Sequence, residues 1–119
     1  MRKQAAGTPA KSPIIPRRAA WRTATKITAC LKTSRPSLSE ITDLISATAR
    51  RFADEIVEQE NERKTIYRRV KKDALRSARK ILAFDKSLPN LRREIAMRVE
   101  AIVGWIEYEC YISKAMAWA

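Results

Sequence analysis

Glycine is almost absent from this chain, and its scarcity restricts the available folds more than any other feature. The 119 residues contain two glycines, Gly7 and Gly104, with 96 residues between them. Hairpin turns of the Asn-Gly kind, phosphate-binding loops and dinucleotide-binding motifs all need glycine. The five prolines, at positions 9, 13, 16, 36 and 89, separate long segments rather than interrupt them. We therefore expect an all-α protein, either a helical hairpin or a three- to four-helix bundle.

Apolar residues recur with a helical period along the middle of the chain. Ser37 and Glu40 have the spacing of a capping box, which predicts a helix over residues 38–60. A second apolar stripe predicts a helix over residues 63–87, with Ile66 or Tyr67 followed by Val70, Ala74, Ser77, Ile81, Phe84 and Leu88. The junction allows two interpretations, a left-handed cap at Asn61 or one continuous or gently bent helix, and we favour the continuous helix.

The first 36 residues combine several prolines with a weaker apolar pattern. We predict that residues 1–16 form a flexible basic tail and that residues 17–119 form a single helical domain. A short helix over residues 17–33 would carry the stripe Ala20, Ala24, Ile27 and Leu31. Residues 26–31 also fit a short strand, so both secondary structures stay open there.

The last predicted helix, residues 91–118, is apolar on two sides. One stripe consists of Ile95, Val99, Ile102, Val103, Ile106 and Cys110. The other consists of Met97, Ala101, Trp105, Tyr108, Ile112 and Met116. Both apolar sides must be buried, and the second side packs against either the helix over residues 17–33 or another molecule. Large aromatic and methionine side chains are typical of interfaces. The candidate partner interface is therefore Trp105, Tyr108, Ile112 and Met116.

Charge is divided into four blocks along the sequence. The formal charge is +9 over residues 1–36, −5 over 37–62, +10 over 63–93 and −2 over 94–119, which gives the net +12. A surface charged only for solubility does not require this separation. A strong positive excess favours an anionic partner, such as nucleic acid, an anionic membrane surface or an acidic protein.

The stretch YRRVKKDALRSARK, residues 67–80, carries seven cations and one acid, Asp73. On a helix, the apolar residues of this region fall within an arc of roughly 120° and the cations fall in the opposite half, over a length of about 25 Å. Only Arg63 departs from this arrangement. The candidate nucleic-acid-binding residues are Lys64, Arg68, Arg69, Lys71, Lys72, Arg76, Arg79, Lys80 and Lys86.

A helix face of one sign suits the backbone of nucleic acid. Cations that neutralise phosphates release counterions, and arginine forks fit phosphate oxygens. Solvated faces usually mix both signs, because like charges four residues apart repel. We predict a non-enzymatic subunit or accessory factor that binds DNA or RNA. Two alternatives are an adaptor or inhibitor that docks on an acidic protein surface, and a structural protein in which the acidic helix of one copy pairs with the basic helix of another.

Residues suited to catalysis or metal binding are few. The chain has no histidine, and Cys30 and Cys110 are too few ligands for a zinc site, so we expect two reduced thiols in the core. We predict no enzymatic activity, no cofactor, no metal and no small-molecule substrate. The chain contains no run of 18 apolar residues, so we predict no membrane span. The expected location is the cytoplasm or the nucleoid, although the acid-free first 36 residues also fit a mitochondrial transit peptide.

Overall fold

The computed structural model describes the backbone of residues 11–118 and the side chains of residues 18–110. This part of the chain forms four helices and no strand: α1 (Lys11–Thr33), α2 (Leu38–Ile56), α3 (Glu60–Leu82) and α4 (Leu91–Trp118). The all-α prediction is confirmed. The alternative of a strand over residues 26–31 is wrong, because these residues lie inside α1. Over the described helices, no segment combines the length and apolarity needed to cross a bilayer.

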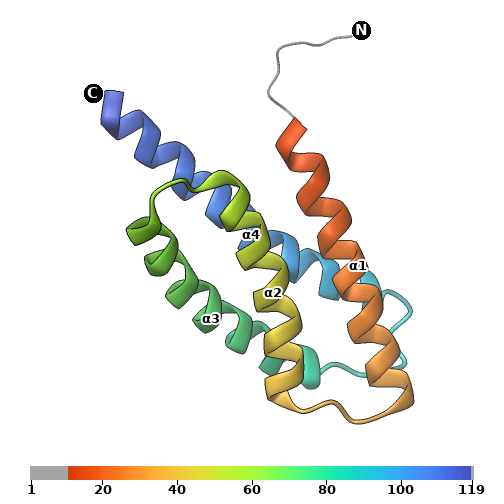
Figure 1. The fold of residues 1–119 in the computed structure, drawn as a ribbon. Helices are drawn as coiled ribbons and strands as arrows, with labels where there is room; N and C mark the ends of the chain where they lie inside the picture. The colour runs from red at the N-terminus through yellow and green to blue at the C-terminus, as the bar shows by residue number, and fades with distance from the viewer. Residues whose placement is uncertain (1–10, 119) are drawn as a thin grey trace, which may run out of the picture.

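The helices form a thin bundle, about 17 Å across in its shortest dimension. α1, α2 and α3 run in alternating directions, and α4 crosses behind them (Figure 1). α4 contacts each of the other three helices. Within the described residues α1 and α3 make no contact, so α2 lies between them.

Buried side chains from all four helices form one continuous core. The stripes predicted for α1 and for the first side of α4 both belong to it, apart from Cys110, which is half-buried. The fully buried branched residues are Ile27, Ile41, Ile45, Val70, Ile81, Ile95, Val99 and Ile106. Burial of each such side chain stabilises the fold by about 1.5–3 kcal/mol relative to exposure.

The start of α2 follows the predicted capping box. The Ser37 backbone N–H donates to Glu40 Oε1 (2.9 Å), and the Glu40 N–H donates to Ser37 Oγ (3.1 Å). The hydrogen bond from the Ser37 backbone, assisted by its side chain, holds the pKa of Glu40 below its ordinary value. The predicted start at residue 38 is therefore confirmed.

The junction of α2 and α3 differs from both predicted forms. The chain leaves the helix at Val57, which is extended (φ −104°, ψ 115°), and no non-glycine residue within the described range has a positive φ. Val57 turns its side chain into the core. Arg63 Nε donates to the Val57 carbonyl (2.9 Å) and Arg63 Nη2 to the Glu58 carbonyl (3.1 Å). Arg63 departs from the cationic face because it satisfies the carbonyls of this break.

The end of α3 lies at Leu82, five residues before the predicted end. Asp85 Oδ1 accepts hydrogen bonds from the Ser87 backbone N–H (2.9 Å) and from Ser87 Oγ (2.7 Å). These two hydrogen bonds lower the pKa of Asp85, and the one from the Ser87 backbone N–H contributes most. An aspartate that binds its own chain two residues on stabilises a turn in competition with a helix.

The beginning of α1 also differs from the prediction. The helix starts at Lys11 rather than at residue 17, so part of the predicted tail is helical. Pro13 lies in the first turn, where a missing N–H removes no intrahelical bond. Residues 1–10 of the predicted tail lie outside the described residues.

We predict that Arg63→Ala lowers the free energy of unfolding by about 1–2 kcal/mol, because it removes two charged hydrogen bonds to backbone carbonyls. Arg63→Lys should restore less than half of the loss, since an ammonium group cannot reach both carbonyls as a fork. Urea denaturation of the three proteins measures these differences. Equal stability of the alanine variant and the wild type would mean that burial of Val57 alone holds the junction.

We predict that Gly104→Ala stabilises the isolated chain by about 0.5–1 kcal/mol, because glycine is a poor residue for a helix interior. A Cβ at Gly104 would meet no atom within 4 Å. The control is Ala101→Gly, at an exposed position of the same helix, which should lose a similar amount. Urea denaturation measures the stability change of each variant as a shift in the midpoint at constant slope. Destabilisation by Gly104→Ala would instead contradict the open space around this position.

Candidate nucleic-acid interface

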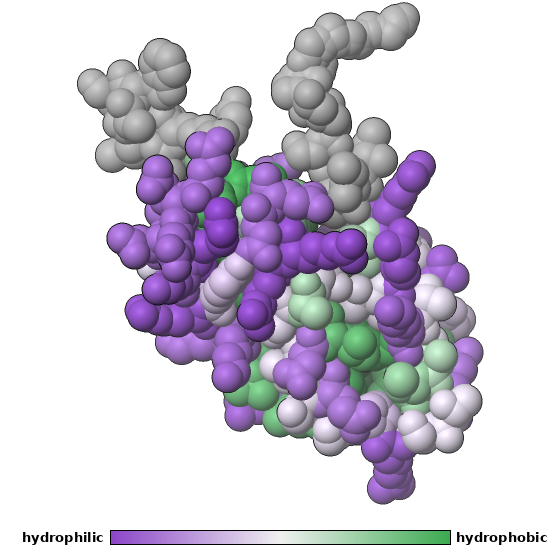
Figure 2. All heavy atoms as spheres, viewed as in Figure 1, coloured by the Kyte–Doolittle hydropathy of each residue, from purple (hydrophilic) through white to green (hydrophobic). Residues whose placement is uncertain are grey.

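Eight of the nine candidate cations lie on α3, and all eight are exposed. We call them the α3 basic face: Lys64, Arg68, Arg69, Lys71, Lys72, Arg76, Arg79 and Lys80. The ninth, Lys86, is exposed in the loop after Leu82 and lies outside the helix that organises the others. Hydrophilic side chains gather over α3, at the left of the view in Figure 2.

Packing of the opposite side of α3 turns this face toward solvent. The buried residues are Ile66, Val70, Ala74, Ala78 and Ile81. The first three and Ile81 belong to the predicted stripe, whereas Ala78 replaces Ser77, which is only half-buried. The predicted Phe84 is half-buried in the loop after the helix. α3 packs these residues against α2 and α4 together, so its orientation is fixed on two sides.

Three cations of the face are engaged within the molecule. Lys64 Nζ lies 3.6 Å from Glu60 Oε1, and Arg76 Nη1 lies 3.5 Å from Asp73 Oδ1. Arg69 pairs both with Asp73 (3.7 Å) and with Glu109 of α4 (3.7 Å). Among the side chains that the structure describes, the other five make no ion pair: Arg68, Lys71, Lys72, Arg79 and Lys80.

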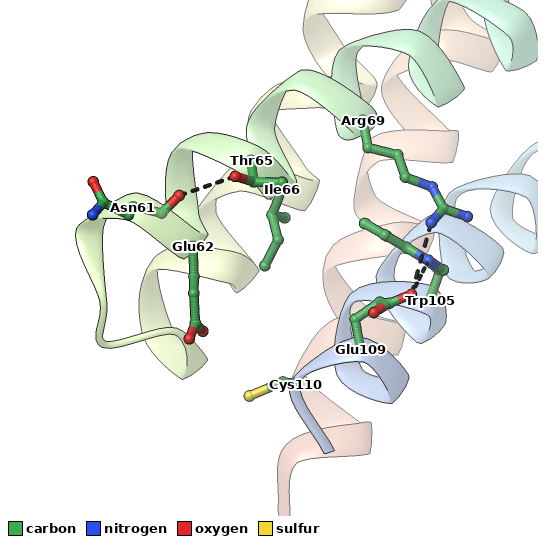
Figure 3. Close-up of a pocket in the computed structure, with 8 residues that line it drawn as sticks. All are labelled: Asn61, Glu62, Thr65, Ile66, Arg69, Trp105, Glu109 and Cys110. Atoms are coloured by element: carbon green, nitrogen blue, oxygen red, sulfur yellow. Dashed lines mark hydrogen bonds and ion pairs between the residues drawn. The ribbon is translucent and has the colours of Figure 1, made fainter. Parts of the chain in front are cut away.

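Arg69, Trp105 and Glu109 form a cluster that ties α3 to α4 (Figure 3). The Arg69 guanidinium lies over the Trp105 ring, 3.9 Å from its centroid. Trp105 Nε1 donates to Glu109 Oε1 (3.2 Å), the same oxygen that faces Arg69. Cation–π contact and ion pairing thus give Arg69 a structural role, and its charge is already partly compensated.

A groove of about 400 Å³ adjoins this cluster, between the first turns of α3 and the middle of α4. Asn61, Glu62 and Thr65 line it on the α3 side, and Cys110 lines it on the α4 side (Figure 3). Cys110 and Cys30 are both free and half-buried. Cys110 Sγ contacts the Ile56 carbonyl oxygen at 3.6 Å, which places this thiol against the end of α2.

Only part of the candidate partner interface on α4 is exposed to solvent in the described residues. Trp105 is half-buried and engaged with α3, whereas Tyr108 is 62% exposed and Met97 is 55% exposed. Among the described residues of the second stripe, Met97, Ala101 and Tyr108 are exposed, so the expectation that α1 covers this side is wrong there. The side chains of Ile112 and Met116 lie outside the described residues.

α2 lies between α3 and α1 and carries several exposed acids. Glu40, Asp43 and Asp54 of α2 are exposed, as is Glu58 in the turn after it. Asp54 accepts a hydrogen bond from the Tyr67 hydroxyl, and Arg50 lies over the Tyr67 ring at 4.9 Å. A second group of cations, on α1 and at Arg51, lies beyond this acidic surface, and the sequence pattern did not identify it.

Comparison of the chain with protein-family models, with curated proteins and with solved structures found no match.

We predict that the two classes of cation on α3 behave differently on substitution. Arg69→Ala should lower the free energy of unfolding by about 1 kcal/mol, because it removes the interactions with Trp105 and Glu109. Arg79→Ala should change it by less than about 0.5 kcal/mol, because it breaks no ion pair. Urea denaturation of each variant gives the two values. Equal destabilisation by the two substitutions would contradict a structural role for Arg69.

Proposed function

We propose that this protein binds the backbone of DNA or RNA through the α3 basic face, as a non-enzymatic subunit or accessory factor of a larger complex. The observation that carries the proposal is the set of five exposed cations without an ion pair among the described side chains, Arg68, Lys71, Lys72, Arg79 and Lys80, on one side of a helix packed on its other side. We place such a role in the cytoplasm or at the nucleoid.

The dimensions of the face suit a short length of backbone. Arg68 and Lys80 are twelve residues apart, which is about 18 Å along a helix. One strand of a duplex presents a phosphate every 3.4 Å along the axis, so this length corresponds to about five phosphates. The helix holds its cations in fixed register, which lowers the entropy cost of binding.

The physical gain comes from release of counterions rather than from reading of bases. Each phosphate neutralised by lysine or arginine releases condensed cations, and affinity then falls steeply with salt. Arg68 and Arg79 also offer forked donors that match phosphate oxygens. Contacts of this kind fix position on nucleic acid without specifying its sequence.

Self-assembly is the second candidate, and it rests on the exposed acids of α2 and of the turn that follows it. Glu40, Asp43, Asp54 and Glu58 offer a surface opposite in sign to the α3 basic face. Pairing of α2 of one copy with α3 of the next would use two different surfaces and would extend into open arrays. Light scattering at low and high salt without nucleic acid separates this candidate from the first. An adaptor that docks on an acidic protein would show neither arrays nor nucleic-acid binding.

We predict that the triple variant Arg68→Ala, Lys72→Ala and Arg79→Ala binds a 20-base-pair duplex at least tenfold more weakly at low salt. The slope of log affinity against log salt should become shallower by about 0.9 for each phosphate that the variant no longer neutralises, or about 0.7 on a single strand. Alanine is the best helix former, so circular dichroism should show an intact helix. Fluorescence anisotropy at four salt concentrations measures affinity and slope together.

The matched control removes the same charge elsewhere: Lys32→Ala, Arg35→Ala and Arg93→Ala. These three residues are exposed and lie outside α3. The control should keep the wild-type slope. Equal slopes for the wild type and the α3 variant, or an equal weakening in the control, would overturn the proposal.

A further inference from the structure

A second groove, of about 480 Å³, lies between α1 and α2, on the far side of α2 from the α3 basic face. α1 and α2 run in opposite directions, and α4 passes behind them (Figure 1). Val103 of α4 contributes to the lining, so the groove has walls from two helices and a base from a third. Its volume lies within the range of about 300–1,000 Å³ that is usual for small-molecule sites.

The base of this α1–α2 groove is apolar. Phe52 and Val103 are buried beneath it, and Leu44 and Ala47 line the α2 wall. The hydroxyls of Thr23 and Thr48 are hydrogen-bonded to each other across the two helices. This contact satisfies both hydroxyls, so the surface between the walls is suited to an apolar group. Figure 2 shows apolar surface between hydrophilic side chains where α1 and α2 lie.

The rim of the groove is cationic on both walls. Arg18, Arg22 and Lys26 stand four residues apart along α1, and Arg51 stands on α2. All four are exposed, and among the described side chains none makes an ion pair. Glu55 is the one acid in the lining, one turn after Arg51. The lining therefore keeps an excess of three positive charges.

The fold itself gains nothing from this arrangement of charge. Cations four residues apart on one helix repel each other and destabilise the helix by a few tenths of a kcal/mol per pair. The chain before α1 does not supply the opposite charge, since residues 1–10 contain Arg2 and Lys3 and no acid. An anionic group from outside the molecule would relieve the repulsion.

We propose that the α1–α2 groove binds a small amphiphilic anion, an aromatic or aliphatic body joined to a phosphate. The body lies on the surface formed by Leu44, Ala47 and Phe52. The phosphate lies between Arg22 and Arg51, whose guanidinium groups can donate paired hydrogen bonds to its oxygens. A nucleotide and an alkyl phosphate share this chemistry. The site is separate from the proposed nucleic-acid interface, because α2 lies between α1 and α3, which make no contact within the described residues.

The experiment titrates the ¹⁵N-labelled full chain with AMP and, separately, with octyl phosphate below its critical micelle concentration. We expect at least one of them to cause saturable shifts at the amides of Ala19, Thr23, Ala47 and Thr48. Binding of AMP would show that the groove takes a nucleotide, and binding of octyl phosphate would show that it takes a lipid-like phosphate. Octanol and inorganic phosphate, each carrying half of the chemistry, should bind at least tenfold more weakly.

Two variants locate the site without disturbing the core. Arg22→Ala with Arg51→Ala should weaken binding at least tenfold, and Ala47→Glu, at an exposed position, should abolish it by placing an acid in the groove. Arg79→Ala on α3 is the matched control and should bind as the wild type does. Any one of three results would overturn the proposal: no saturable shift with either ligand, shifts of equal size on α3, or inorganic phosphate that binds as tightly as both ligands.

Discussion

The orientation of α3 is the constraint on which the rest of the surface depends. Val70, Ala74, Ala78 and Ile81 are fully buried on one side of this helix. Two of them are alanines, which let the helix approach its neighbours closely. Because α2 and α4 both pack on that side, α3 cannot rotate without exposing the core. The eight cations of the α3 basic face are therefore held outward as a consequence of packing.

Charge segregation in the sequence becomes a spatial separation in the bundle. The acidic block forms the outer side of α2, and basic blocks form α3 and α1 on either side of it. Contacts across these boundaries are few and specific: Tyr67 with Asp54 and Arg50 on one edge of α3, and Arg69 with Trp105 and Glu109 on the other. Of these boundary contacts, only that of Arg69 engages a cation of α3, because Tyr67 is neutral. Five cations of the α3 basic face stay unpaired within the described residues, so an anionic partner would gain the most binding free energy there.

Local signals in the sequence were enough to predict the helices, whereas their ends depended on interactions at a distance. The capping box at Ser37 and Glu40 lies within four consecutive residues, and it formed as predicted. The break after Ile56 depends on Arg63, whose side chain returns to carbonyls five and six residues earlier. The predicted periodicity continued past Leu82 to Phe84 and Leu88, but the Asp85–Ser87 turn ended the helix first.

The cations of α3 could be found from the sequence because they are dense and contiguous. Their pattern could not separate Arg69 from Arg79, since the pairing of Arg69 needs Glu109, forty residues later. The α1–α2 groove was missed for a similar reason. The spacing of Arg18, Arg22 and Lys26 is visible in the sequence, but only the fold brings Arg51 to the opposite wall.

Lysine footprinting tests most directly the claim that the α3 basic face binds nucleic acid, because it reports on each lysine separately and needs no substitution in the protein. The chain is acetylated briefly with and without a saturating single strand, and the rate at each lysine is read by mass spectrometry. The account predicts a several-fold lower rate at Lys71, Lys72 and Lys80 in the presence of the strand, with Lys32 unchanged. Equal rates at the α3 lysines with and without nucleic acid, or protection confined to Lys3 and Lys11, would contradict it.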